Sequence, residues 1–266
     1  MPRVRRSEAD QRLVDEHGPD FSEALARGLR VISAFGAERP LMTLADVARE
    51  VDLPRATVRR ALHTLDRLGY VRSDGRLFQL TPKVLSLATA YLSSNSLSAT
   101  LQQAVERVAG RLNEACSAAI LDGDDIVFIA RAGPTRLLGV GVDVGYRIPA
   151  YCSSMGRVLL GGLDDGDLAA FLERIRPEPL TPQTLVDRAA LRTAIHRDRA
   201  QGYSLVDQEA EVGYRSLAVP VRRYDGRIVC ALNAGANVDR VAVERMLETF
   251  LPVLRDVAAT LAPQMV

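Results

Sequence analysis

Hydrophobic residues recur at helical spacing in three short segments, which predict helices over residues 21–36, 44–51 and 54–69. The positions expected to face inward are Phe21, Leu25, Leu29 and Ile32 in the first helix, Leu44, Val47, Ala48 and Val51 in the second, and Thr57, Val58, Ala61, Leu65 and Leu68 in the third. Pro54 separates the second helix from the third, because the residue before a proline avoids the helical region while the proline fits a first turn.

A small hairpin follows the third helix. The segment YVRSDGRLFQL, residues 70–80, alternates apolar and polar side chains around Asp74-Gly75, a dipeptide suited to a tight turn. Arg72 and Arg76 flank this turn. Three short helices followed by a two-stranded wing predict a winged helix-turn-helix over residues 21–82, which binds double-stranded DNA.

The apolar pattern changes after residue 82. Residues 83–97 predict a linker helix whose apolar side chains cover more than one side, as in a helix that also packs on a second copy: Val84, Leu85, Leu87, Ala88, Tyr91 and Leu92. Beyond it we expect a helical stripe at Leu101, Val105, Val108 and Leu112, strands within 116–132, 137–145, 216–223 and 227–235, and helices at 154–160, 165–175, 188–199 and 241–261. This order predicts an α+β domain with an antiparallel sheet over residues 98–266.

Charge is uneven along the chain although its sum is small. The 266 residues carry a formal net charge of +1, but residues 39–83 hold nine basic and five acidic residues. Lys and Arg contacts to phosphate supply most of the affinity of non-specific DNA binding. The candidate DNA contacts are Arg55, Ala56, Thr57, Arg59, Arg60 and His63 on the third helix, and Arg72 and Arg76 on the wing. A merely solvated surface is the alternative, which the scarcity of acids on this helix face disfavours.

The candidate contacts divide by the part of DNA that they reach. Arg55, Arg59 and Arg60 are the expected base readers, because arginines at the start of a recognition helix can pair with guanine edges in the major groove. Arg72 and Arg76 are expected at the phosphate backbone or the minor groove. Residues 1–20 form a basic arm with Arg3, Arg5 and Arg6, for which phosphate contact and no role at all both stay open.

Composition excludes several other classes. With 47% hydrophobic and 25% charged residues the chain is typical of globular proteins, and no apolar run approaches the roughly 18 residues of a membrane span. The N-terminal MPRVRRSEADQR lacks the apolar core of a secretory signal, so we expect a cytoplasmic protein without a membrane partner. Three cysteines and three histidines lie far apart without metal-ligand spacing, and we expect no metal or other cofactor.

An enzyme is the competing class. Cys152 stands just before a predicted helix start, where a thiol nucleophile can be activated. A general base is hard to find, since His196 lies in the helical stretch RTAIHRDRA among arginines. No paired carboxylates or phosphate loop appear in the sequence. We therefore expect no catalytic residues.

Several phrases resemble the IclR family of bacterial transcriptional regulators over nearly the whole chain. They are ALARGLRVISAF, LADVAREVDLPRATVRRALHTLDRLGYV and RIPAYCSSMGRVLLG. Within the family, PAYCSSMGRVLL and LDGDDIVFIARA look most similar to the branch that governs protocatechuate and 4-hydroxybenzoate catabolism through the β-ketoadipate pathway. The resemblance implies a GAF-like effector-binding domain, a homodimer that can pair into a dimer of dimers, and a promoter operator with repeated half-sites.

The expected effector is a small organic acid such as protocatechuate, 4-hydroxybenzoate or β-ketoadipate. Ser153 and Ser154 stand at a strand-to-helix turn, where they either cap the helix or bind a ligand whose carboxylate meets the free N–H groups. By resemblance the pocket lies at this turn and the two later strands, and the candidate effector contacts are Ser153, Ser154, Met155, Asp207, Tyr214, Ser216 and Asn233. Tyr214 and Asn233 stand where relatives can carry smaller or hydroxyl residues, which leaves the ligand open. A second domain that only oligomerises the protein is the remaining alternative.

Overall fold

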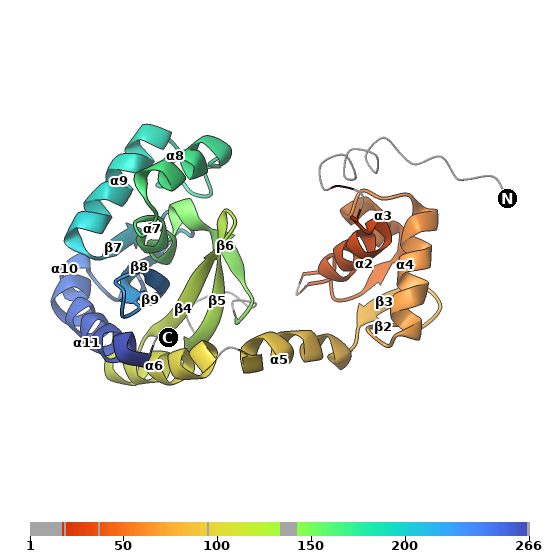
Figure 1. Ribbon diagram of the computed structural model, residues 1–266, viewed down its shortest axis with the longest axis horizontal. Helices are drawn as coiled ribbons and strands as arrows, with labels where there is room; N and C mark the ends of the chain where they lie inside the picture. The colour runs from red at the N-terminus through yellow and green to blue at the C-terminus, as the bar shows by residue number, and fades with distance from the viewer. Residues whose placement is uncertain (1–17, 19, 37, 95, 134–142, 265–266) are drawn as a thin grey trace. The chain divides into compact units, whose positions relative to one another are not determined.

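The computed structural model describes residues 18, 20–36, 38–94, 96–133 and 143–264 (Figure 1). The chain forms two compact units, Met1–Tyr91 and Leu92–Val266. Each unit has its own hydrophobic core. The division falls inside the segment 83–97 that the sequence predicts as a linker. The expected basic arm, residues 1–20, lies almost wholly outside the described residues.

In the described part of the N-terminal unit, three helices precede the wing: α2 (Glu23–Ser33), α3 (Leu44–Glu50) and α4 (Arg55–Arg67). Thr43 caps α3 through a capping box, in which its hydroxyl accepts from the Asp46 N–H and the Asp46 carboxylate accepts from the Thr43 N–H. Pro54 immediately precedes α4, as its fixed backbone angle favours. The expected helix-turn-helix is therefore α3 and α4.

The wing is the hairpin of β2 (Val71–Ser73) and β3 (Leu77–Leu80). Gly75 takes a positive φ of 98° in the connecting loop, where a side chain would be strained. The short strand β1 (Met42–Thr43), which the hydrophobic pattern did not indicate, pairs with β3 and ties the wing to the start of α3.

Some inward positions expected from helical spacing are wrong. Leu25, Leu29 and Leu68 are exposed by 63%, 51% and 52%, whereas Leu62 is fully buried in the core of the N-terminal unit. The buried residues of α4 are Val58, Leu62 and Leu65, so the core-facing side of the helix includes position 62, which the prediction left out, and excludes position 68. The exposed leucines leave an apolar surface on this unit.

The segment after the wing forms the 3-10 turn η1 (Pro82–Val84), helix α5 (Leu85–Ser94) and helix α6 (Ser96–Leu112). Leu85, Leu87 and Tyr91 are exposed on α5. The predicted stripe on α6, Leu101, Val105, Val108 and Leu112, is buried as expected.

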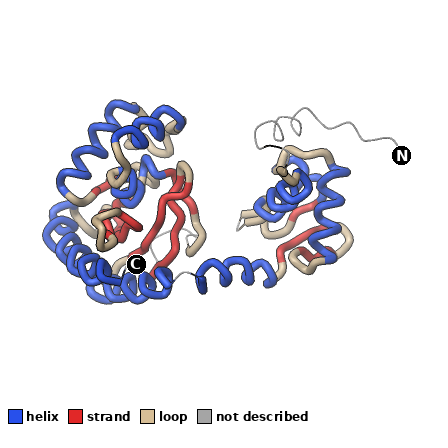
Figure 2. Tube along the Cα trace, viewed as in Figure 1, coloured by secondary structure: helices blue, strands red, loops and turns tan. Residues whose placement is uncertain are grey.

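A six-stranded antiparallel sheet forms the centre of the C-terminal unit, with the strand order β6-β5-β4-β9-β8-β7 (Figure 2). The strands are β4 (Ala115–Asp122), β5 (Asp125–Ala132), β6 (Arg147–Pro149), β7 (Ser204–Asp207), β8 (Tyr214–Arg222) and β9 (Ile228–Asn237). The sequence pattern did not indicate β7, and most of the strand expected at 137–145 lies outside the described residues.

Helices cover both faces of this sheet (Figure 1). One face packs on α6 and on a C-terminal helical segment made of α10 (Val243–Arg245), the π-helical turn η3 (Met246–Phe250), α11 (Leu251–Leu261) and η4 (Ala262–Gln264). The other face packs on α7 (Ser154–Leu160), α8 (Asp165–Arg174) and α9 (Arg188–Gln201), and η2 (Ala150–Cys152) leads into α7. The α+β class, with a winged helix-turn-helix and a mixed C-terminal domain, is confirmed.

Candidate DNA-binding surface and effector pocket

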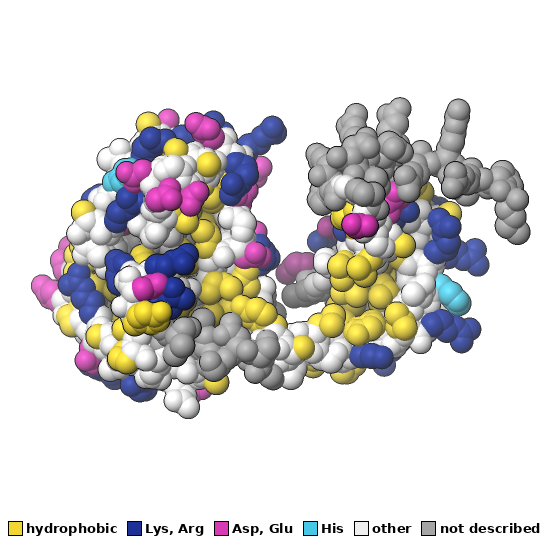
Figure 3. Space-filling view, viewed as in Figure 1, with side chains coloured by type: hydrophobic (Ala, Val, Ile, Leu, Met, Phe, Trp, Pro, Cys, Tyr) yellow, Lys and Arg dark blue, Asp and Glu magenta, His cyan; other side chains and the backbone are white. Residues whose placement is uncertain are grey.

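The candidate DNA-binding surface is the outer side of α4. Arg55, Ala56, Arg59, Arg60 and His63 are all exposed along this helix. Within the described part of the chain, no carboxylate forms an ion pair with these three arginines. Figure 3 shows Lys and Arg side chains gathered along the edge of the unit that α4 occupies. The surface is thus a set of free cations on a rigid helix, which suits phosphate and base contacts.

The start of α4 offers backbone donors as well. Pro54 precedes the helix without a side-chain cap, whereas the N–H groups of Thr57 and Val58 already donate to the Pro54 carbonyl at 2.8 and 3.1 Å. The N–H groups of Arg55 and Ala56 have no acceptor within the helix. Such donors, at the positive end of the helix dipole, attract phosphate.

The other predicted contacts lie at the margins of this surface. Arg72 and Arg76 are exposed on the wing, on either side of its loop. Thr57 is half-buried and borders an apolar groove on the unit, as does Arg60. Thr57 is therefore less accessible to DNA than the neighbouring arginines are.

The candidate effector pocket lies in the C-terminal unit, between the start of α7 and the loop 208–213. Its described lining consists of Phe128, Tyr146, Ile148, Cys152, Ser153, Ser154, Met155, Val206, Glu209, Ala210, Glu211, Tyr214, Ser216 and Asn233. The structure thus brings together six of the seven residues that the sequence proposed. The cavity is small, about 90 Å³, against roughly 300–1,000 Å³ for pockets that hold drug-sized ligands. It therefore suits a compact molecule.

Polar groups in the pocket are fixed by hydrogen bonds. The Ser153 hydroxyl accepts from the Gly156 N–H at 3.0 Å and so caps α7. The Ser154 and Ser216 hydroxyls lie 2.7 Å apart and are hydrogen-bonded to each other. Asn233 Oδ1 accepts from the Ser117 N–H at 3.1 Å, which leaves Nδ2 as the group able to donate to a ligand.

Asp207 is the one predicted effector contact that the structure places outside the pocket lining. Its carboxylate accepts from Arg215 Nε and Nη2, each at 3.1 Å. The preceding residue, Val206, lines the pocket, and successive side chains of a strand point to opposite faces. Asp207 is accordingly a structural partner of Arg215.

A buried ion pair beneath the pocket was not foreseen. Arg157 Nη2 lies 2.6 Å from Glu209 Oε2, and only 2% of Arg157 is exposed. Arg157 Nε also donates to the Tyr151 carbonyl, while Glu209 Oε2 accepts from the Leu185 N–H. Arg157 and Glu209 stand far apart in the sequence on a helix and a loop, so no local pattern connects them. The pair holds the loop 208–213 at the pocket.

Two threonines also hold this loop through its backbone. Thr181 Oγ1 donates to the Gln208 carbonyl and Thr184 Oγ1 to the Glu209 carbonyl, both at 2.6 Å. Gln208 has a positive φ of 61°, an uncommon conformation for a residue with a side chain. The loop that borders the pocket is thus held by side chains of the segment 176–187.

The thiol of Cys152 lies in the pocket but is not activated. Burial raises the pKa of Cys152 to about 12, and the negative charge of Glu209 adds to the rise. The described lining contains no histidine. The thiol therefore stays protonated near neutral pH, whereas a nucleophile needs the thiolate.

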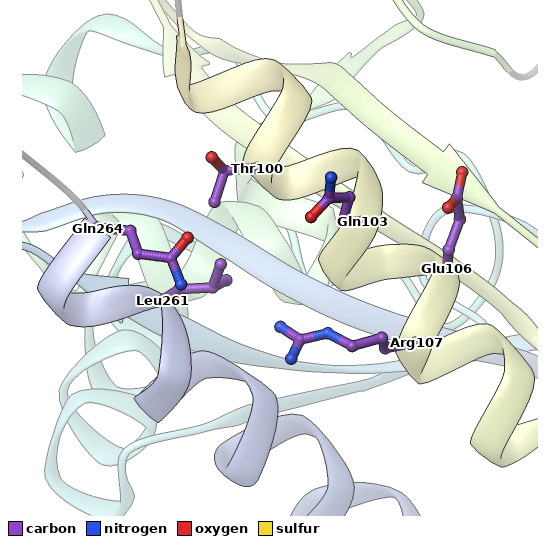
Figure 4. A pocket seen from close by; sticks show the side chains of 6 residues that line it. All are labelled: Thr100, Gln103, Glu106, Arg107, Leu261 and Gln264. Atoms are coloured by element: carbon purple, nitrogen blue, oxygen red, sulfur yellow. The ribbon is translucent and has the colours of Figure 1, made fainter.

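A second hollow of the C-terminal unit has a different character. Thr100, Gln103, Glu106 and Arg107 of α6 line an open depression together with Leu261 and Gln264 (Figure 4). Arg107 Nη2 donates to Thr260 Oγ1 at 3.1 Å. Leu261 is the one apolar side chain among these six lining residues. Among the described residues, no group of three or more acidic, His or Cys side chains could hold a metal ion, and no helix is long and apolar enough to cross a membrane.

A winged helix-turn-helix joined to a domain with a small, partly polar pocket defines a DNA-binding transcriptional regulator. Family models agree with this class. The IclR helix-turn-helix domain matches residues 24–75, and the C-terminal domain of bacterial IclR transcriptional regulators matches residues 89–262. The chain belongs to the IclR family of bacterial transcriptional regulators.

Individual relatives cover almost the whole chain. The Pca regulon regulatory protein of Pseudomonas putida is 45% identical over 248 residues, which are 93% of this chain and 85% of that protein. The p-hydroxybenzoate hydroxylase transcriptional activator of Acinetobacter baylyi is 32% identical over 244 residues, 90% of each. An IclR homolog from Microbacterium hydrocarbonoxydans, crystallised with 4-hydroxybenzoate, has a TM-score of 0.74 at 26% identity and covers 89% of this chain and 96% of that one.

Proposed function

We propose that the protein regulates an operon for the catabolism of an aromatic acid and responds to a small carboxylate of that pathway. The observation that carries this proposal is the compact pocket between α7 and the loop 208–213, where Phe128 and Met155 offer apolar surface beside a hydroxyl pair. Candidate effectors are protocatechuate, 4-hydroxybenzoate and β-ketoadipate. The names of the two relatives, and the 4-hydroxybenzoate bound to the Microbacterium homolog, support an aromatic acid.

The proposed partners follow from the two units. Arg55, Arg59 and Arg60 of α4 read base edges of an operator, and Arg72 and Arg76 of the wing contact its backbone or minor groove. Ser153, Ser154, Met155, Tyr214, Ser216 and Asn233 contact the effector. Because operator DNA is the target, we place the protein in the cytoplasm.

We further propose a homodimer, which can pair into a dimer of dimers, on an operator with repeated half-sites. An apolar groove of about 640 Å³ lies on the N-terminal unit between α2, α4 and α5. Leu25, Leu29, Leu68 and Leu87 line it, and each is more than half exposed. Figure 3 shows hydrophobic side chains gathered on the visible face of this unit. Contiguous exposed apolar surface on a soluble protein marks an interaction site, and a second copy of the chain fits a symmetric operator.

Titration calorimetry of the full-length protein with the three candidate acids tests the sensing role. We expect at least one acid to bind below about millimolar concentration and to raise the melting temperature. At a hundredfold excess over its dissociation constant, a ligand that binds only the folded state adds about 2.7 kcal/mol to the free energy of unfolding. A C-terminal domain that only oligomerises the protein would bind none of them.

A pocket variant locates the binding site. Ser154→Leu removes a hydroxyl that is bonded to Ser216 and fills the cavity, so it should abolish acid binding while leaving DNA binding without ligand largely intact. Thr193→Leu, an exposed position on α9, is the control for the added bulk. If the Ser154→Leu protein still binds and responds to the acid, the effector lies elsewhere.

A further inference from the structure

One row of side chains crosses the sheet beside the effector pocket. Arg131 on β5 is directly opposite Ser117 on β4, and Ser117 is directly opposite Asn233 on β9. Residues directly opposite each other in antiparallel strands point to the same face of the sheet. Asn233 lines the pocket. Arg131 therefore stands on the pocket face of the sheet, with only the small Ser117 side chain between it and Asn233.

Among the described residues, the guanidinium of Arg131 has no hydrogen-bond or ion-pair partner. Its Nη1 atom is buried without a hydrogen-bond acceptor, and no carboxylate of the described residues forms an ion pair with it. The backbone is nevertheless held firmly, because the Arg131 N–H donates to Gln102 Oε1 and its carbonyl accepts from Gln102 Nε2, at 3.2 and 3.0 Å. A buried cationic donor without an acceptor is unfavourable, and an anion placed there would remove that cost.

Tyr214 connects this arginine with the pocket. Its ring lines the pocket and passes over Gly235, where an added Cβ atom would lie 1.6 Å from the Tyr214 hydroxyl. Burial raises the pKa of Tyr214, and the nearby positive charge of Arg131 opposes that rise. The hydroxyl thus remains protonated at neutral pH and is available as a donor. Only a glycine at 235 leaves room for it.

The pocket needs a cation if its ligand is an acid. The described lining includes the carboxylates of Glu209 and Glu211 but no Lys or Arg. The start of α7 is a poor alternative, because Ser153 already caps it, the Ser154 hydroxyl is bonded to Ser216, and Glu209 stands close by. Among the described residues, Arg131 is an unpaired cation on the same face of the sheet.

We propose that Arg131 and the Tyr214 hydroxyl form the anion-binding end of the effector site and receive the carboxylate of the ligand. The hydroxyls of Ser154 and Ser216 then form a hydrogen bond with a hydroxyl group at the opposite end of the ligand's aromatic ring. The ligand class is a hydroxylated aromatic carboxylate with its two polar groups at opposite ends. This assignment rests on the proposed sensing role of the pocket and moves the carboxylate away from the position near Ser154 expected from the sequence.

Calorimetry of the full-length protein with 4-hydroxybenzoate and with its uncharged analogue 4-hydroxybenzamide tests the assignment. The wild-type protein should bind the acid at least tenfold more tightly than the amide. Arg131→Gln should weaken acid binding 10- to 100-fold and leave amide binding unchanged, and Arg131→Lys should restore part of the preference for the acid. Tyr214→Phe should weaken acid binding several-fold. Arg222→Gln, an exposed arginine on β8, is the matched control and should change neither affinity.

The melting temperature without ligand gives an independent readout. Arg131→Gln should melt at or above the wild-type temperature, since it removes an unpaired buried charge; a drop of several degrees would show that Arg131 has a structural partner and would overturn the assignment. Equal acid binding by wild type and Arg131→Gln would also overturn it, while the proposed sensing role would stand. If the wild-type protein bound neither compound, the assignment would be overturned, whereas the sensing role would fail only if protocatechuate and β-ketoadipate also did not bind.

Discussion

At the scale of single residues, we expect recognition of DNA to depend on arginines that form no ion pair with any described residue. Arg59 is exposed on the outer side of α4 and forms no ion pair with a described residue. We expect Arg59→Ala to weaken operator binding by about 1–3 kcal/mol, roughly 5- to 150-fold, because a good bidentate base contact contributes that much. Fluorescence anisotropy with labelled operator DNA over a range of salt concentrations measures the effect.

The control is Arg192→Ala, which removes an exposed arginine from α9 in the C-terminal unit. It should leave affinity and salt dependence unchanged. A folded Arg59→Ala protein with wild-type affinity and base preference would contradict the assignment of α4 as the recognition helix.

At the scale of elements, the loop 208–213 depends on the buried pair of Arg157 and Glu209. We expect Arg157→Met to reduce the free energy of unfolding by about 3–5 kcal/mol, because it leaves the Glu209 carboxylate buried without its cation. Urea denaturation followed by circular dichroism measures the change. Arg174→Met breaks an ion pair of similar length to Asp124 whose side chains are 56% and 46% exposed, and it should cost less than about 1 kcal/mol. Equal losses for both variants would contradict the structural role of the buried pair.

Elements with a strong local signal could be predicted from the sequence. The predicted helix at 154–160 coincides with α7, and both strands around Gly123 and around Gly226 are where alternation and turn residues indicated them. β1 and β7 were missed because strands of two and four residues carry little alternation and form only through pairing with β3 and β8.

The site was predictable to a similar degree. The serines and Met155 of the α7 turn follow from their place in the sequence, and resemblance added Tyr214, Ser216 and Asn233. Contacts between distant segments, such as Arg157 with Glu209, depend on tertiary packing and leave no periodic trace. Asp207 was misplaced because the direction of a strand residue depends on the register of a strand that was not foreseen.

At the scale of the whole molecule, we propose that a second copy of the chain covers the apolar groove on the N-terminal unit. We expect the protein to be at least a dimer at micromolar concentration, and Leu29→Glu to weaken association, because it puts a charge into the groove. Light scattering coupled to size exclusion measures the mass. Tyr224→Glu, at a 78% exposed position of the C-terminal unit, is the control and should keep the wild-type mass. A monomeric wild-type protein would refute the proposed dimer.

We expect ligand binding in the C-terminal unit to change the DNA affinity of the N-terminal unit. A ligand can change DNA affinity only if it binds the conformation that binds DNA and the conformation that does not with different free energies. This difference in binding free energy is typically about 1–3 kcal/mol. The direct test is operator affinity of the full-length protein, measured by anisotropy with and without saturating acid on DNA selected by the protein from a random library. We expect operator affinity to change roughly 5- to 150-fold in either direction with the acid, and we expect this change to be lost in Ser154→Leu. An acid that binds the protein and leaves operator affinity unchanged would contradict this expectation.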